Sequence, residues 1–113
     1  MNEHILPIRK EDKLFFNAIK DGLKKIETRA GSPAYLKIKE NDILVFACSG
    51  KKIRKKIKTI HHFKSVEQLL NKFNFKDIMP LVSSKKEAIK TWYTFPGYKE
   101  RLEKYGILAF VLC

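Results

Sequence analysis

The sequence has few cysteines and no long apolar run, and each shortage excludes a class of protein. Its longest apolar stretches, residues 43–48 and 107–113, have the length of a strand and are far too short to span a membrane. The N-terminal segment lacks the apolar run of a secretory signal, so we expect a cytoplasmic protein. Cys48 and Cys113 lie within the apolar stretches, without the paired spacing of a metal or redox site. We interpret both as core residues and expect no disulfide.

Motifs for metal or nucleophilic chemistry are also missing. The adjacent His61 and His62 would point to opposite faces of a strand, which makes them a poor metal site, and His4 is isolated. No serine stands in the pattern of a nucleophile elbow. We therefore predict no metal and no cofactor.

Acidic residues are scarce relative to basic ones. The chain has 24 lysines and arginines against 12 aspartates and glutamates, which leaves a net charge of +12. Such an excess favours polyanionic partners, namely RNA, DNA or an anionic membrane surface. A lysine-rich surface without a specific partner is the alternative. Because the charge is clustered rather than evenly spread, we expect RNA or a nucleoside ligand and no membrane binding.

The size and the segmentation of the chain indicate one domain spanning residues 1–113. Its 113 residues, 44% of them hydrophobic, suffice for one core and are too few for two domains. No repeat, low-complexity tract or linker interrupts the sequence.

Apolar spacing and capping residues predict the helices. A helix over residues 10–21 should end at Gly22, with its apolar stripe made by Leu14, Phe15, Ala18 and Ile19. Two more helices should begin at capping boxes, a serine followed three residues later by Gln or Glu. The two boxes are Ser65–Gln68 and Ser84–Glu87. A further short helix is predicted over residues 98–105.

Strands are predicted within residues 22–29, 43–48 and 107–113. Residues 51–63 fit either a helix or a strand, because their isoleucines match both periods. We favour the strand, since Ser49-Gly50 resembles a hairpin turn and the apolar residues are β-branched. Its outer face would then carry a stripe of positive charge, which we call the hairpin cations: Lys51, Lys52, Arg54, Lys56 and Lys58.

Interleaved strands and short helices predict an α+β fold. We expect a small mixed β-barrel of about five to six strands with flanking helices. Closure into a barrel would also leave so short a chain without exposed sheet edges.

Three segments in order resemble the ASCH domain family of the PUA-like superfamily. They are GLKKIETR at residues 22–29, IKENDILVF at residues 38–46 and YKERLEKYGILAFVL at residues 98–112. Gly22, Lys24, Ile26, Glu27 and Arg29 match the first family motif, and Asp42 matches the turn before the apolar strand. Asn41 replaces the usual glycine of that turn, and asparagine also tolerates a left-handed backbone. The resemblance covers nearly the whole chain.

The resemblance implies a PUA-like barrel with a cleft lined by the Lys–Glu–Arg set, and a role linked to RNA. Some small bacterial relatives are amidohydrolases that act on N4-acetylcytidine, and others are described as ribonucleases. In those amidohydrolases Lys24 matches the catalytic lysine, whereas a threonine stands at the position of Glu27. Their catalytic glutamate has no secure counterpart here, and Glu67 and Glu87 are the nearest candidates.

Strand alternation provides a separate reason to single out the first motif. If Ile26 faces the core, then Lys25, Glu27 and Arg29 lie on the opposite face. Glu27 can then hold the Arg29 guanidinium in one orientation for a phosphate or a base edge. Lys24 would swing over the same cleft as a phosphate contact, or act as a base or nucleophile if a dry cleft lowers its pKa. The alternative is a set of ion pairs on a solvated strand.

The leading hypothesis is therefore an RNA-binding protein. Lys24, Lys25, Glu27 and Arg29 would line the cleft, and Tyr98, which we expect to be exposed, would stack on a base. Lys52, Arg54, Lys56 and Lys58 would contact the RNA backbone. The alternative is a hydrolase, either a nucleoside amidohydrolase or a ribonuclease, with Lys24 and Glu27 as its catalytic residues.

Overall fold

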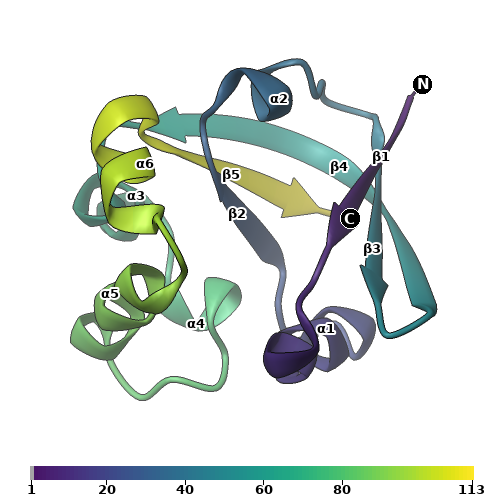
Figure 1. The fold of residues 1–113 in the computed structure, drawn as a ribbon, viewed down its shortest axis with the longest axis horizontal. Coiled ribbons are helices and arrows are strands. Elements are labelled where there is room, and N and C mark those ends of the chain that lie inside the picture. The colour runs from purple at the N-terminus through teal and green to yellow at the C-terminus, as the bar shows by residue number, and fades with distance from the viewer. Residues whose placement is uncertain (1) are drawn as a thin grey trace.

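The computed structural model describes residues 2–113, which form five strands and six α-helices (Figure 1). The strands are β1 (Glu3–Pro7), β2 (Ile26–Ala30), β3 (Ile43–Cys48), β4 (Lys51–Phe63) and β5 (Ile107–Leu112). The helices are α1 (Lys13–Lys20), α2 (Pro33–Leu36), α3 (Val66–Lys72), α4 (Phe75–Ile78), α5 (Lys85–Thr94) and α6 (Tyr98–Tyr105). A 3-10 turn over Lys10–Asp12 precedes α1. Sequence patterns did not reveal β1, α2 and α4, which are all very short.

The five strands form one open mixed sheet in the order β1-β3-β4-β5-β2. β1 runs parallel to β3, and the other neighbours are antiparallel. The predicted α+β class and mixed sheet are confirmed, but the prediction of a closed barrel is wrong. β1 and β2 do not pair with each other, so the sheet keeps two edges. The reason lies in side chains along β2, described below.

The β3–β4 hairpin confirms the choice of a strand for residues 51–63. Its turn residues Ser49 and Gly50 have φ angles of 49° and 82°, the left-handed pair that suits a tight two-residue hairpin turn. All five hairpin cations are exposed. Arg54 forms an ion pair with Glu3 of β1.

Two clusters of apolar residues pack on opposite faces of the sheet. One lies between the sheet and helices α3–α6, which gather on the same side of the molecule in Figure 1. The other lies between β1, β3, β4 and α1. β5 contributes Ile107 and Ala109 to the first cluster and Leu108 and Phe110 to the second. Burial on both faces explains why this strand is apolar at every position.

The helix caps agree with the sequence, whereas two predicted core positions do not. Ser65 and Ser84 each accept a hydrogen bond from the backbone N–H three residues on. In α1, however, Leu14 is 65% exposed and Phe16 is buried, because the helix presents a different side to the sheet. Cys48 is buried as predicted, but Cys113 follows the end of β5 and is exposed.

Asp42 joins the beginnings of β1 and β3. Its carboxylate accepts hydrogen bonds from the backbone N–H groups of Asn2, at 3.2 Å, and Lys39, at 3.1 Å. The other partner is His4, whose Nε2 lies 2.8 Å from Asp42 Oδ2. The preceding Asn41 has a φ of 74°, in the left-handed region that asparagine tolerates. These contacts, led by His4, lower the pKa of Asp42 to about 2.

We expect Asp42→Asn to weaken the protein at neutral pH and to reduce its sensitivity to acid. The folded-state pKa of about 2 lies below the ordinary 3.8, so the unfolded chain binds the proton more readily as the pH falls. The stability contributed by the carboxylate is complete above about pH 4 and is lost as the pH falls through about 2. Urea unfolding at a series of pH values measures this change. Asp21→Asn, at an exposed carboxylate, is the control, and identical pH slopes for Asp42→Asn and wild type would contradict the prediction.

Candidate functional site

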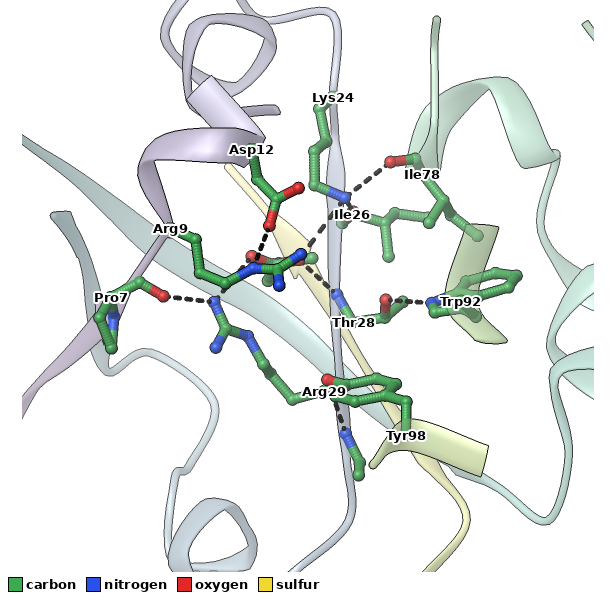
Figure 2. Close-up of polar contacts among 12 residues, drawn as sticks. Pro7, Arg9, Asp12, Lys24, Ile26, Thr28, Arg29, Ile78, Trp92 and Tyr98 are labelled. Atoms are coloured by element: carbon green, nitrogen blue, oxygen red, sulfur yellow. Dashed lines mark hydrogen bonds and ion pairs between the residues drawn. The ribbon is translucent and has the colours of Figure 1, made fainter. Parts of the chain in front are cut away.

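β2 is an edge strand, and side chains bind three of its outward-facing backbone groups. Among the strands it pairs with β5 alone, so every second residue directs its N–H and C=O away from the sheet. Dashed lines in Figure 2 mark these contacts along residues 24–30. Lys24 Nζ donates to Ile26 O at 2.9 Å, Glu27 Oε1 accepts from Thr28 N at 2.8 Å, and Tyr98 Oη accepts from Ala30 N at 3.4 Å.

Lys24 is held in the interior rather than extended over a cleft. Its ammonium nitrogen also donates to Ile78 O of α4 at 2.6 Å and lies 3.5 Å from Glu27 Oε1. The residue is only 5% exposed. Burial lowers the pKa of Lys24, and the Glu27 carboxylate offsets only part of this effect. Because its three donor directions already have partners, Lys24 cannot swing over the cleft as the sequence suggested.

Glu27 lies between two cations. Its second oxygen, Oε2, is 3.5 Å from Arg29 Nη2. Burial would raise the pKa of Glu27, but Lys24, Arg29 and the hydrogen bond from the Thr28 N–H together outweigh that effect and the pKa is lowered. The side chain is therefore a carboxylate at neutral pH, in contact with both basic groups.

Arg29 bridges the two edges of the open sheet. Its Nη2 donates to Pro7 O at the end of β1, at 3.4 Å, and its guanidinium carbon lies 5.9 Å from the Tyr35 ring centre. Figure 2 shows the guanidinium directed from β2 toward Pro7. The gap between β1 and β2 is thus crossed by a side chain instead of a backbone ladder.

A cavity of about 310 Å³ opens beside this edge. This volume lies at the lower end of the range for small-molecule sites, roughly 300–1,000 Å³. Trp92 is 1% exposed, and its Nε1 donates to Thr28 Oγ1 at 3.0 Å (Figure 2). We call the buried residues of the wall the floor: Lys24, Glu27, Thr28, Met79 and Trp92.

Two arginines flank two touching aromatic rings along the rim. Arg9 donates from Nε to Asp12 Oδ2 at 2.8 Å, and its guanidinium lies 5.6 Å from the Phe95 ring centre. Phe95 and Tyr98 meet edge to face with their centres 5.5 Å apart, and the Arg101 guanidinium is 5.5 Å from the Tyr98 ring centre. We call the row Arg9, Phe95, Tyr98 and Arg101 the rim ladder. Sequence patterns did not single out Arg9, which lies far from the other rim residues in the chain, or Arg101, which belongs to no motif although it lies three residues after Tyr98 on α6.

The structure gathers some of the predicted site residues and separates others. Lys24, Glu27, Arg29 and Tyr98 line the cavity. Lys25 is exposed and does not, because it precedes β2 and its backbone binds α4 and β5 instead. The expectation that Tyr98 is exposed is wrong: it is half-buried, and burial raises its pKa. None of the residues Lys52, Arg54, Lys56 and Lys58 lines the cavity.

Other classes of site find no support within residues 2–113. No three histidine, cysteine, aspartate or glutamate side chains come together in a way that could hold a metal ion. No helix among these residues has the length and apolar character needed to cross a membrane.

Comparison with known proteins places the chain in a family. Residues 12–112 match the ASCH domain. The chain belongs to the ASCH domain family. This family is generally thought to bind RNA, and the family predicted from the three sequence segments is confirmed.

Two solved structures support the same assignment. The crystal structure of hypothetical protein PH0355 is 31% identical, with a TM-score of 0.83, over 99% of this chain and 97% of its own. The solution NMR structure of protein PF0455 from Pyrococcus furiosus is 29% identical, with a TM-score of 0.75, over 97% of this chain and 94% of its own. A comparison with curated proteins gave no match.

Replacing Lys24 should destabilise the ASCH domain much more than replacing the lysine beside it. Lys24→Met removes the donor to two buried carbonyl groups and one cation beside Glu27, and breaking such buried charge pairs costs about 3–5 kcal/mol. Lys25→Met changes the same side chain at an exposed position and should alter stability by less than about 0.5 kcal/mol. Urea unfolding at neutral pH measures both variants. Equal stabilities for the two would show that Lys24 does not tie α4 to β2.

Proposed function

We propose that this ASCH domain protein binds single-stranded RNA and accommodates one unpaired base in the cavity beside β2. The observation that carries the proposal is the position of Arg29: its guanidinium is oriented by Glu27 in a cavity that also presents aromatic rings. An oriented guanidinium suits a base edge or a phosphate, and aromatic side chains stack on unpaired bases.

The floor of the cavity favours a base with hydrogen-bonding groups over an apolar ligand. Among residues 2–113, the 3.5 Å contact with Arg29 is the one polar contact of Glu27 Oε2, so this oxygen can accept a further hydrogen bond. The Thr28 hydroxyl accepts from Trp92 and retains its own proton for donation. A buried carboxylate beside a hydroxyl therefore offers an acceptor and a donor to the edge of a base.

The hairpin cations would contribute the contacts to the RNA backbone. They lie on β4, outside the cavity and exposed to solvent, and Arg54 is partly neutralised by Glu3. Contacts between exposed cations and phosphates add affinity without reading the base. If about five phosphates of a single strand are engaged, log affinity should fall against log salt with a slope near −3.5.

Fluorescence anisotropy with a labelled single-stranded RNA tests both parts of the proposal. Arg29→Gln should weaken binding by tenfold or more at physiological salt, which corresponds to about 1.4 kcal/mol, because it removes the oriented guanidinium. Lys56→Gln removes the same charge from the hairpin, and should instead reduce the salt slope by about 0.7 with a smaller loss of affinity. Circular dichroism confirms that both variants are folded.

Two results would contradict the proposal. One is the absence of RNA binding by the folded wild-type protein at moderate salt. The other is equal affinity of Arg29→Gln and wild type for the RNA. That result would mean that the positive surface binds polyanions without using the cavity.

Hydrolysis of a modified nucleoside is the second candidate, favoured by one observation. Lys24, whose pKa is lowered by burial, lies 3.5 Å from Glu27 at the cavity floor, and such perturbed groups gather at catalytic sites. In this alternative Lys24 and Glu27 would be the catalytic residues of an amidohydrolase acting on N4-acetylcytidine, or of a ribonuclease. The two carbonyl acceptors that hold Lys24 oppose it, because they occupy the nitrogen that would attack or accept a proton.

Chromatography of N4-acetylcytidine after incubation with the purified protein tests for the amidohydrolase, and a denaturing gel of incubated RNA tests for the ribonuclease. Since Lys24→Met is expected to unfold more easily, Glu27→Gln is the sharper probe: it should abolish turnover if Glu27 moves a proton. We expect no turnover by the wild-type protein and intact RNA on a denaturing gel. Release of cytidine that Glu27→Gln abolishes would establish the amidohydrolase, and cleaved RNA would establish the ribonuclease.

A further inference from the structure

We infer that the cavity recognises a nucleotide by its phosphate as well as by its base. It would therefore prefer a nucleoside monophosphate unit, free or at the end of an RNA strand, to a neutral nucleoside. The inference rests on the nucleotide-binding role proposed above. It assigns Arg9 and Arg101, which sequence patterns did not single out, as the residues that hold the phosphate.

The charge of the cavity wall favours an anion. Four cationic side chains and two carboxylates line it, which leaves an excess of two positive charges. Lys24 and Glu27 lie at the buried floor, in contact with each other and with Arg29. The remaining pair of cations, Arg9 and Arg101, belongs to the rim, where a single carboxylate, Asp12, faces them.

Both rim arginines are fixed at one side and free at the other. Asp12 binds the Nε of Arg9, which leaves its two terminal nitrogens available. Among residues 2–113, Arg101 has no carboxylate within ion-pair distance and is held against the Tyr98 ring. A guanidinium fixed in this way can bind a phosphate with two parallel hydrogen bonds at a small entropic cost.

The rim ladder positions the two guanidinium groups on either side of two touching rings. Arg9 lies over Phe95, Arg101 lies over Tyr98, and the two rings meet edge to face. Interleaved aromatic and cationic groups are the arrangement that takes bases by stacking and phosphates by charge. The ladder lies at the mouth of a cavity that holds about one ring system, so base and phosphate can be bound together.

Glu27 sets the direction in which the nucleotide enters. At the floor the Glu27 carboxylate needs a donor and the Thr28 hydroxyl can donate, and a base edge offers both a donor and an acceptor, whereas an ionised phosphate offers acceptors alone. We therefore place the base in the interior and the phosphate at the rim. A strand end or a free nucleotide satisfies this arrangement.

Isothermal titration calorimetry with matched ligands tests the inference. Each of the four common ribonucleosides is compared with its 5′- and 3′-monophosphates. For the base that binds best, we expect a monophosphate to bind at least tenfold more tightly than the nucleoside. Arg9→Gln and Arg101→Gln should each reduce that preference to threefold or less. Lys99→Gln removes an exposed charge from α6, the helix of Arg101, at a position that does not line the cavity. This variant should keep the preference for the monophosphate.

Oligonucleotides with and without a terminal phosphate distinguish the two sources of the ligand. A preference for the phosphorylated oligonucleotide identifies an RNA end, and a preference confined to mononucleotides identifies a free nucleotide; both support the inference. Equal affinity for nucleosides and monophosphates would overturn it, as would an effect of Lys99→Gln equal to that of Arg101→Gln. RNA binding that depends on Arg29 but not on a phosphate would overturn this inference alone and leave the proposed function standing.

Discussion

The free edge of β2 is the constraint on which the other features of this ASCH domain depend. A strand that pairs on one side only must satisfy its remaining backbone groups in some other way, because buried unpaired groups are costly. Here Lys24, Glu27 and Tyr98 bind three of those groups with their side chains. The sheet stays open between β1 and β2, and side chains cover part of the edge that closure into a barrel would have removed.

This solution also creates the polar cavity. Side chains that bind the backbone of an edge strand have to carry charge or a hydroxyl group, and they lie at the place where the sheet fails to close. Glu27 is surrounded by basic groups for a structural reason, since its carboxylate compensates a buried lysine and an arginine that bridges to β1. The same arrangement leaves one carboxylate oxygen and part of a guanidinium facing a hollow, and those groups can meet a ligand without any change in the fold.

Sequence reasoning succeeded where one residue type or one period dominated a segment. Ser65 and Ser84 identified two helix starts, and the apolar residues 43–48 and 107–112 identified two strands. The family motif brought together Lys24, Glu27 and Arg29, which do share a cavity. Strand alternation within the motif was misleading for Lys25, because β2 begins one residue later, and it did not predict that Thr28 lines the cavity beside Glu27 and Arg29. Contacts between distant segments left no local pattern, so Arg9 near the start of the chain could not be paired with Phe95.

The division of charge between the cavity and the hairpin bears on what the large positive charge can do. The hairpin cations lie on an exposed strand, where salt screens them and each adds little selectivity. The cavity arginines are fewer, but each is oriented by a ring or a carboxylate, so their hydrogen bonds depend on the shape of the ligand. A net charge of +12 therefore supports attraction at long range, whereas discrimination between ligands falls to the few arginines around the open edge of β2. The residues that can distinguish one ligand from another therefore lie beside the unpaired edge of β2, where the sheet stays open.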